Sequence, residues 1–556
     1  MKVYMWNKRI MGVVVALGLV LAACGGGGVS AGPTDSEGPE ASVPEAAEQT
    51  LRVNISQEPP HLDPTLASDS ISIQVLRSLS YPLVYFDADL NPVPGLADSW
   101  EISPDGTEIT YHLGAHKYSN GEDIVAGDFV YSFRKLADPR VTSDYSYVLE
   151  PVVGWAELQD LGADTTDADL EDLGVEAPDD STFVVTLHDP SSYFLFVTTM
   201  WLTVPLKPDF TFAEADGYVS SGPMMMTEWR HQSNIVLEPN PNWNLDPVKI
   251  DRIEMAMIND PTAALAAFEA DELDISGIPR ADVNRYRDDP ELAALLLEKP
   301  SLSLTYFGFD LKNPDGPFTK SVALRRAFNQ AIDKDLMLAT IFSGLGIVAY
   351  AAVPPGMAGY DDTVFHPYDV AAAQADFAAG LAELGITKDD LNLEIGYNVA
   401  GSNEDLVVFF QEQWRTVFDI EVTAVPFGDF GAYLDALEVD PTDIFRLGWG
   451  ADYPHPQNFL YDLFNKDSGN NYMGYNSPEF EDVMLQARSA SDVDEQIALY
   501  QQAQEVLMAD LPFIPQTYGA LFAAVKPWVQ GVTQTAAETS SGTGEYFYYQ
   551  ISIAEH

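Results

Sequence analysis

The sequence predicts an α/β protein of two or three domains. Strand-like and helix-like runs alternate along the chain, as at Leu393–Tyr397, Leu406–Phe418 and Glu421–Val425, and this alternation is typical of α/β folds. A chain of 556 residues with 46% hydrophobic side chains is too long for one ordinary core. No segment repeats at a fixed period, so the domains are expected to differ from one another.

The first residues have the pattern of a secretion signal. Lys2, Lys8 and Arg9 are basic, and Ile10–Leu21 is an apolar run of about twelve residues, shorter than the roughly 20 that span a bilayer. Small residues then precede Cys24, the single cysteine of the chain. This arrangement resembles the lipobox of bacterial lipoproteins, in which the cysteine carries lipid after cleavage.

We therefore predict a signal peptide over residues 1–23 and a lipid anchor at Cys24. The anchor would hold the protein on the outer face of the cytoplasmic membrane, at the cell surface or in the periplasm. The alternative is an ordinary signal peptide in which Cys24 is incidental. Residues 24–49 are four glycines followed by a Ser/Pro/Glu/Ala-rich stretch, and they are predicted to be a disordered linker. No later segment is predicted to span a membrane.

The chain is strongly acidic, with 85 acidic and 28 basic residues and a formal net charge of −57. Binding to a phosphate backbone depends on clusters of lysine and arginine, so no nucleic acid partner is predicted. The acidity has two interpretations, a solvated surface adapted to a salty medium or an acidic cleft that prefers cationic ligands. Composition does not separate them.

The first elements after the linker follow from local signals. Alternation over Leu51–Ile55 predicts a strand, and the prolines in Glu58–Pro64 predict a loop because they remove backbone donors. Trp100–Ile102 and Glu108–Leu113 flank an Asp-Gly turn and predict a hairpin. A helix is predicted to begin at Asp128 as N-cap, with its apolar side chains on one face.

No metal site or cofactor is predicted. His112 and His116 are four residues apart, but a glycine between them and the strand pattern argue against a helical zinc pair. The run Asp164–Asp172 resembles a calcium loop only in its acidity, because it lacks the glycine and the ligand order of an EF-hand. We expect it to be a solvated acidic turn.

The segment Gly448–Leu460, GWGADYPHPQNFL, is the strongest functional signal. Asp452 lies between Trp449 and Tyr453, and a carboxylate among aromatic rings suits a cationic group such as an α-amino group. Arg446 lies six positions upstream, and its guanidinium suits a carboxylate. Opposite charges this close along the chain are what a site for a zwitterionic chain needs.

Each of these residues also has a structural interpretation. In this interpretation, Asp452 is a surface aspartate of an acidic protein, Arg446 pairs with a nearby acid, and Trp449 belongs to the core. Gly448 and Gly450 are predicted to act through their backbone, since glycine lets another strand approach closely.

Motifs spread over the chain in a fixed order resemble family 5 of the solute-binding proteins of ABC importers, the oligopeptide- and dipeptide-binding group. The resemblance covers nearly everything after residue 50. It is carried by Leu90–Asp138, Ser220–Pro223, Glu238–Trp243, Asp310–Lys312, Val322–Asp333 and Leu511–Gln516.

The resemblance implies a two-lobed α/β fold of the periplasmic-binding-protein type II, with a small domain inserted in the N-terminal lobe. The implied limits are 50–84, 203–300 and 518–556 for lobe I, 85–202 for the inserted domain and 301–517 for lobe II. Hinge strands are implied to link the lobes. A monomer is expected.

The resemblance also implies roles for the motif. In the oligopeptide-binding branch, the aspartate that matches Asp452 forms a salt bridge to the peptide α-amino group, and an arginine at the place of Arg446 lies near the ligand carboxylate. From their positions, Tyr453, His455 and Tyr306 are predicted to be lining residues, although alternating aromatics such as Tyr306 are also typical of a core.

The predicted function is to bind short peptides in a cleft between the lobes and to deliver them to a membrane permease that works with separate ATPase subunits. An oligosaccharide or a nickel complex on the same scaffold is the first alternative. A secreted hydrolase is the second, but the sequence has none of the usual catalytic motifs, so no enzyme is predicted.

Overall fold

The computed structural model describes residues 46–191, 193–490, 492–538 and 542–556. The predicted signal peptide, Cys24 and the linker up to residue 45 lie outside the described residues. The linker was predicted to reach Gln49, and this limit is wrong. Gln49 is 8% exposed, and its side-chain amide donates to the carbonyls of Ala46 and Ile553, both at 2.9 Å. Gln49 therefore belongs to the folded part of the chain, where it contacts the C-terminal strand.

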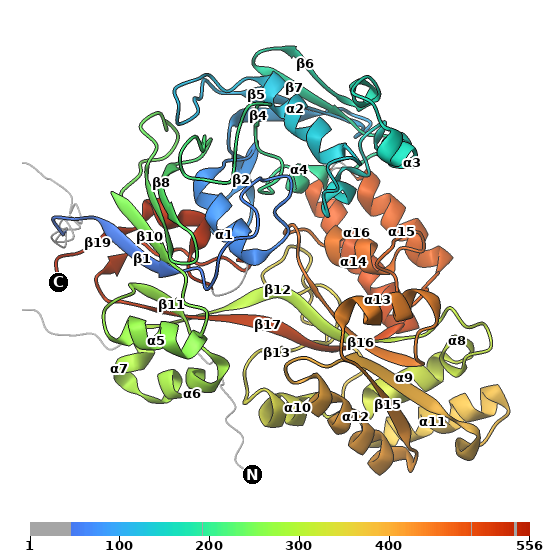
Figure 1. Cartoon of the computed structure of the whole chain (residues 1–556). Coiled ribbons are helices and arrows are strands. Elements are labelled where there is room, and N and C mark those ends of the chain that lie inside the picture. The colour runs from blue at the N-terminus through green and yellow to red at the C-terminus, as the bar shows by residue number, and fades with distance from the viewer. Residues whose placement is uncertain (1–45, 192, 491, 539–541) are drawn as a thin grey trace, which may run out of the picture. The chain divides into compact units, whose positions relative to one another are not determined.

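One large sheet organises the described residues (Figure 1). Its order is β15-β14-β16-β12-β17-β11-β1-β10-β9-β8, and β13 also pairs with β17. The strands, in the order of the sheet, are β15 (Val422–Phe427), β14 (Leu393–Asn398), β16 (Ile444–Gly450), β12 (Leu296–Phe309), β17 (Phe513–Val525), β11 (Ile275–Gly277), β1 (Thr50–Asn54), β10 (Arg252–Ala256), β9 (Asn234–Pro239), β8 (Met224–Arg230), and β13 (Ile347–Val348).

The two longest strands, β12 and β17, join the two ends of this sheet. They are antiparallel to each other, from Leu296 opposite Ala524 to Gly308 opposite Phe513. The register shifts between Pro300 and Leu304, so the pairing is irregular in the middle. The implied lobe limits at 300 and 517 fall inside these two strands, where the chain passes from one end of the sheet to the other.

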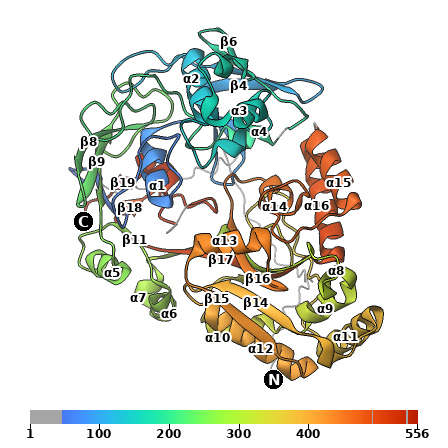
Figure 2. The same cartoon turned by 45° about the vertical axis from the view of Figure 1, so that its right-hand side comes forward.

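At one end of the sheet, helices cover β14, β15 and β16 (Figure 2). The predicted strands and helix here are confirmed within three residues at each end. Their core contains Phe328, Phe377, Phe410 and Trp414, all at most 7% exposed. The helices of this region are α8 (Pro317–Lys320), α9 (Val322–Gln330), α10 (Lys334–Ile341), α11 (Val370–Leu384), α12 (Asn403–Phe418), α13 (Phe430–Val439), α14 (Gln457–Phe464), α15 (Pro478–Ser489) and α16 (Val493–Asp510).

At the other end, β1 confirms the strand predicted over Leu51–Ile55. The core of this part joins apolar residues of β1, β8 and β10 to those of α1 (Ser70–Leu79). Asp69 caps α1, because its carboxylate accepts from the backbone N–H groups of Ile71 at 3.0 Å and Ser72 at 2.9 Å. The remaining elements are α5 (Pro261–Glu269), α6 (Arg280–Asp288), α7 (Pro290–Ala293), β18 (Val529–Gln530), the 3₁₀ helix Glu545–Gln550 and β19 (Ser552–Ile553).

Residues between β1 and β8 form two smaller sheets. The predicted hairpin is confirmed, since β4 (Ala97–Ile102) and β5 (Glu108–Leu113) pair antiparallel. The order of this sheet is β4-β5-β7-β6, and β2 pairs with β3 in the other. The other elements are β2 (Val84–Phe86), β3 (Pro92–Pro94), α2 (Ala126–Ala137), α3 (Trp155–Leu161), β6 (Val175–Asp179), β7 (Thr182–Thr186) and α4 (Phe194–Val197).

The start of α2 corrects a prediction. Asp128 was expected to be the N-cap, but the helix begins at Ala126. Asp128 is the third residue of the helix, and its carboxylate accepts from the backbone N–H of Val125 at 3.0 Å. A carboxylate in the first turn satisfies a free donor as a cap does, so similar chemistry operates three positions after the N-cap residue, Val125.

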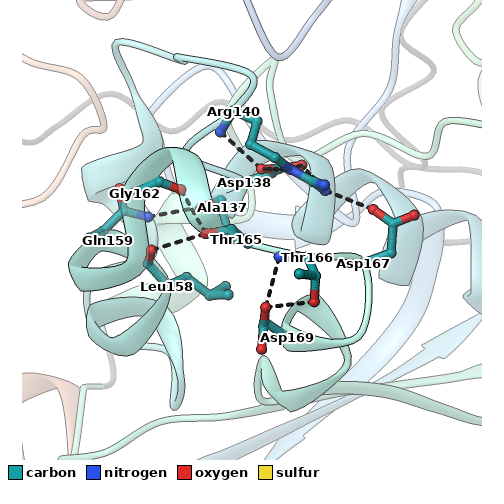
Figure 3. Close-up of polar contacts among 10 residues, drawn as sticks. All are labelled: Ala137, Asp138, Arg140, Leu158, Gln159, Gly162, Thr165, Thr166, Asp167 and Asp169. Atoms are coloured by element: carbon teal, nitrogen blue, oxygen red, sulfur yellow. Dashed lines mark hydrogen bonds and ion pairs between the residues drawn. The ribbon is translucent and has the colours of Figure 1, made fainter.

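The acidic run Asp164–Asp172 starts at the end of one short 3₁₀ turn, Gly162–Asp164, and ends in a second, Asp169–Asp172 (Figure 3). Arg140 pairs with Asp138 and Asp167, each at 2.8 Å, while Asp169 accepts from the N–H and hydroxyl of Thr166 at 2.7 and 2.6 Å. Partners within the protein thus hold the carboxylates of Asp138, Asp167 and Asp169. Among the described residues, no group of three or more metal-ligating side chains lies close enough together to hold an ion.

A helix that crosses a bilayer needs about 20 mostly apolar residues. In the part of the chain that the structure describes, none of the helices combines that length with the required apolar character.

Candidate functional site

A cavity of about 570 Å³ has Asp452 in its wall, and its volume is within the usual range for ligand sites. The wall comes from widely separated segments. They are α1 with the loop after it (Ser68–Phe86), Tyr145, Thr199–Trp201, Arg280, the irregular middle of β12 and β17 (Ser301–Ser303 and Gly519–Leu521), Gly450–Pro454, Ala536–Glu538 and Tyr546. Asp452 therefore lies where the two ends of the large sheet and the inserted segment meet.

The Asp452 carboxylate is held by neutral donors. Its Oδ1 accepts from the Tyr145 hydroxyl at 3.2 Å, and its Oδ2 accepts from the Tyr147 hydroxyl at 2.8 Å and from the Asn458 amide at 3.2 Å. Within the described residues no lysine, arginine or histidine lies within 4.0 Å of it. Burial raises the pKa of Asp452, and the three hydrogen bonds oppose that shift. A cationic ligand would supply the missing countercharge.

Asn458, on α14, organises this part of the wall. Its Oδ1 accepts from the Asp452 backbone N–H at 2.9 Å and from the Trp449 indole at 3.1 Å. Its Nδ2 donates to Asp452 and, at 2.8 Å, to Asp462 one helical turn later. Tyr453 also donates to Asp462, at 3.3 Å. A single amide thus holds the two carboxylates beside each other.

This arrangement predicts a pH dependence of stability. Burial, and then the charge of Asp452, raise the pKa of Asp462 to about 7, above the roughly 3.9 of an unfolded aspartate. Between about pH 4 and pH 7 the folded chain keeps a proton that the unfolded chain has lost, so this carboxyl contributes less stability as the pH rises.

We expect the free energy of unfolding of wild type, relative to Asp462→Asn, to fall by about 1–3 kcal/mol between pH 4 and pH 7.5. Urea unfolding of both proteins across that window measures the difference. A difference that stays constant with pH would contradict the prediction.

The strand before Asp452 has a free edge. β16 pairs with β12 along its length, with Gly448 opposite Thr305 and Gly450 opposite Ser303. On its other side β14 pairs only with Ile444 and Phe445, so among the described residues no strand covers the rest of that edge. The Ala451 N–H donates to β12. The backbone N–H and C=O groups of successive residues in a strand point to opposite sides of it. Those of Gly448 and Gly450 therefore point to the free edge.

The eight residues predicted to bind ligand are not all at the cavity. Gly450, Asp452 and Tyr453 line it. Trp449 and Gly448 stand directly before them on β16, where the Trp449 ring packs against the core. The Arg446 side chain lies beside Gly448, where a Cβ would be 3.8 Å from Arg446 Nη2, an ordinary contact distance.

Arg446 does not line this cavity. Its guanidinium lies near Tyr433 and Tyr306, and burial lowers its pKa. Within the described residues it forms no ion pair, and its Nε has no hydrogen-bond partner. The alternative interpretation of Arg446, in which it pairs with one of the many acids, therefore does not hold in the structure.

Two predicted lining residues lie in the core. Tyr306 is 1% exposed and packs edge-on against Phe513, with ring centroids 5.8 Å apart. His455 is 2% exposed and packs against Phe196 at 4.8 Å. Burial lowers the pKa of His455 to about 3, so the ring is neutral, and its Nδ1 accepts from the Gln457 N–H at 3.2 Å. Their side chains do not reach the cavity wall.

Four residues around Asp452 were not predicted from the sequence, namely Tyr145, Tyr147, Asn458 and Asp462. Asn458 lies within the motif and Asp462 follows it four residues later on α14, so their common helix face was a usable signal. The two tyrosines had none, because 307 residues of chain separate Tyr145 from Asp452.

Comparison with known proteins gives consistent matches. Residues 91–471 match the model of bacterial extracellular solute-binding proteins, family 5, middle. The oligopeptide-binding protein OppA of Bacillus subtilis (strain 168) is 31% identical over 558 residues, covering 97% of this chain and 98% of the relative. The dipeptide-binding protein DppE of the same organism is 26% identical over 522 residues, covering 91% and 93%.

Among solved structures, the unliganded open form of the MppA periplasmic murein tripeptide binding protein superposes with a TM-score of 0.79. It is 23% identical and covers 93% of this chain and 99% of its own. This likeness confirms the fold class predicted from the sequence, a two-lobed α/β fold of the periplasmic binding type.

Proposed function

The chain belongs to family 5 of the bacterial extracellular solute-binding proteins, and from this premise we propose that it binds short peptides and passes them to the permease of an ABC importer. One observation carries the peptide assignment. The Asp452 carboxylate lines a cavity of about 570 Å³ without a cation beside it in the described residues. A relative named for oligopeptides and another named for dipeptides support the same ligand class.

The proposed contacts follow from the geometry of β16. Asp452 takes the α-amino group of the peptide, and the peptide backbone adds to the free edge at Gly448 and Gly450 as an extra strand. Main-chain pairing gives affinity without reading side chains, which suits a carrier of varied peptides. Arg446 is proposed as a partner for the carboxylate of a peptide that lies along that edge, with Trp449 and Tyr453 forming the adjacent wall.

The wider mechanism is domain closure around the ligand. Lobe I is proposed to comprise residues 50–84, 203–300 and 518–556, with lobe II at 301–517 and the inserted domain at 85–202. The irregular pairing of β12 and β17 at Pro300–Leu304 makes this part of the sheet suited to a hinge. Ligand contacts to both sides favour the closed form. The closed protein, a monomer anchored outside the membrane through Cys24, then docks on the permease. It is proposed to carry out no chemical reaction.

Native mass spectrometry of the purified protein tests the ligand class. A ladder of co-purified peptide masses is expected, released intact on denaturation. A hexose series or a metal complex would instead identify one of the alternative solutes. Cleavage of an added peptide by pure protein would point to a hydrolase.

The tyrosines that hold Asp452 give a further prediction. Tyr147→Phe removes a hydrogen bond to the carboxylate, and a bond to a charged group contributes about 1.5–3 kcal/mol. We expect peptide affinity to fall by about tenfold or more at neutral pH. The hydrogen bond from Tyr147 favours the charged form of Asp452, so its loss raises the pKa of Asp452 in the variant. On acidification, the variant should therefore lose peptide binding at a higher pH than wild type does. Calorimetric titrations at several pH values measure both effects, and an unchanged pH profile would contradict the role.

A further inference from the structure

Asp462 is a second carboxylate that stands behind the cavity wall, next to Asp452. Its Oδ2 accepts from the Asn458 amide at 2.8 Å and from the Tyr453 hydroxyl at 3.3 Å. The same amide nitrogen of Asn458 donates to Asp452 Oδ2 at 3.2 Å. Asp452 lines the cavity, whereas Asp462 does not belong to its wall. One amide therefore joins the acid that faces the cavity to an acid behind it.

No countercharge stands beside either carboxylate in the described part of the chain, where neither forms an ion pair with a lysine, arginine or histidine. Both side chains are partly buried. Two negative charges on the same nitrogen oppose each other, and burial adds to the cost of each. The pair therefore keeps one proton at a pH at which exposed aspartates have lost theirs.

The hydrogen bonds indicate which acid holds that proton. The Asp452 carboxylate accepts three of them, from Tyr145, Tyr147 and Asn458, and the Asp462 carboxylate accepts two. Such donors stabilise the charged form of an acid, so the charge is favoured on Asp452 and the proton on Asp462. Burial, and then the charge of Asp452, raise the pKa of Asp462 to about 7, which agrees with this placement.

The other groups that face Asp462 leave this balance in place. Arg488, on α15, lowers the pKa of Asp462, but by less than the charge of Asp452 raises it. The charge of Arg488 also faces Glu150. The tyrosines around Asp462 are neutral near pH 7, because burial raises the pKa of each. They are Tyr147, Tyr193, Tyr453, Tyr461 and Tyr500.

An α-amino group bound at Asp452 changes the balance. Its positive charge offsets the charge of Asp452, which removes the repulsion that an ionised Asp462 would meet. Asp462 then gives up its proton more readily, although burial still opposes the loss. The second negative charge in turn attracts the bound ammonium group. Because this linkage is reciprocal, conditions that remove the proton strengthen binding and conditions that supply it weaken binding.

We propose that Asp462 is a positioning residue of the peptide site, which releases its proton to the solvent when an α-amino group binds at Asp452. Peptide affinity consequently rises between about pH 6 and pH 7. This inference rests on the proposed function, because it needs an ammonium group at Asp452. It concerns a proton exchanged on binding, whereas the pH dependence of stability described above concerns a proton exchanged on unfolding.

Calorimetry in two buffers of different ionisation enthalpy counts the protons exchanged on binding. The probes are alanine peptides of two to six residues, which have no titrating side chain and whose α-amino groups, with pKa values near 8, are protonated at pH 6.5. At that pH wild type is expected to release about 0.4–0.7 protons per peptide. Its affinity should rise about three- to fivefold from pH 6 to pH 7.

Two variants assign the proton. Asp462→Asn has no proton to release at this position, so its proton count should be close to zero and its affinity should change less than about twofold from pH 6 to pH 7. Asp216→Asn removes a carboxylate from an exposed residue outside the cavity wall, and it should release as many protons as wild type. A cooperative urea transition shows that each variant is folded.

Three results would overturn the inference. If wild type binds a peptide without releasing a proton at pH 6.5, or if Asp462→Asn releases as many protons as wild type, Asp462 is not the source and peptide binding itself stands. The first of these measurements needs no variant. If wild type binds no alanine peptide of any length, both the proposed function and this inference fail.

Discussion

Asp452→Asn is expected to reduce the affinity for peptides with a free α-amino group by roughly two to four orders of magnitude. Removing one partner of a buried ion pair typically costs about 3–5 kcal/mol, and each 1.4 kcal/mol corresponds to about a factor of ten in affinity. Asparagine keeps the shape, but only its Oδ1 accepts, so the change removes the charge together with the hydrogen bonds donated to one of the two carboxylate oxygens. Calorimetric titration of a peptide that co-purifies with wild type measures the loss.

Two controls separate the role of the charge from general effects. Asp216→Asn removes the same charge from an exposed residue remote in sequence from the cavity wall, and its affinity should match that of wild type. An N-acetylated form of the same peptide should bind wild type and Asp452→Asn about equally, because it lacks the ammonium group. Wild-type affinity of Asp452→Asn for the free peptide would remove the assignment.

The second large effect is expected on stability. Arg77→Met should lower the free energy of unfolding by about 3–5 kcal/mol, because it removes the cation from a buried ion pair. The Arg77 and Glu545 side chains are 9% and 0% exposed. Arg77 also donates to the Ala537 carbonyl at 3.2 Å and lies 3.6 Å from the centroid of the Tyr546 ring. It therefore ties α1 to the C-terminal segment, and both contribute to the cavity wall.

Urea unfolding of Arg77→Met, Glu545→Gln and the double variant measures this pair. The double variant should lose clearly less than the sum of the single variants, because neither charge then remains buried alone. Arg415→Met breaks exposed ion pairs with Glu412 and Glu421, and it should cost less than about 1 kcal/mol. A similarly small loss for Arg77→Met would show that the buried pair does not stabilise the fold.

Local patterns in the sequence were sufficient for many elements. The hairpin at Trp100–Leu113, β1, β14 and α12 follow from periodicity and turn residues, and the structure places them within a few residues of the prediction. The helix with Asp128 as its predicted N-cap begins three residues earlier than that prediction implied. Such errors are expected at helix ends, because a cap and a first-turn carboxylate both satisfy free backbone donors there and occur in the same stretch of sequence.

Sequence position was a weaker guide to the site. Asp452 and Tyr453 line the cavity, whereas His455 stands two residues further on with its ring in the core. A chain that leaves a strand and enters a helix turns neighbouring side chains in different directions. Adjacency to a motif therefore does not establish that a residue faces the ligand.

The sequence by itself determined the α/β class and the family, and it indicated an aspartate suited to a cation, because each depends on patterns within short stretches of chain. Only the tertiary structure decided what surrounds that aspartate. Tyr147 lies 305 residues from Asp452 along the chain, and Arg280 reaches the same cavity from another helix. Which distant segments meet depends on the order of strands in the sheet and on how helices pack over them. That order is set by burial of the whole core, and no local pattern records it.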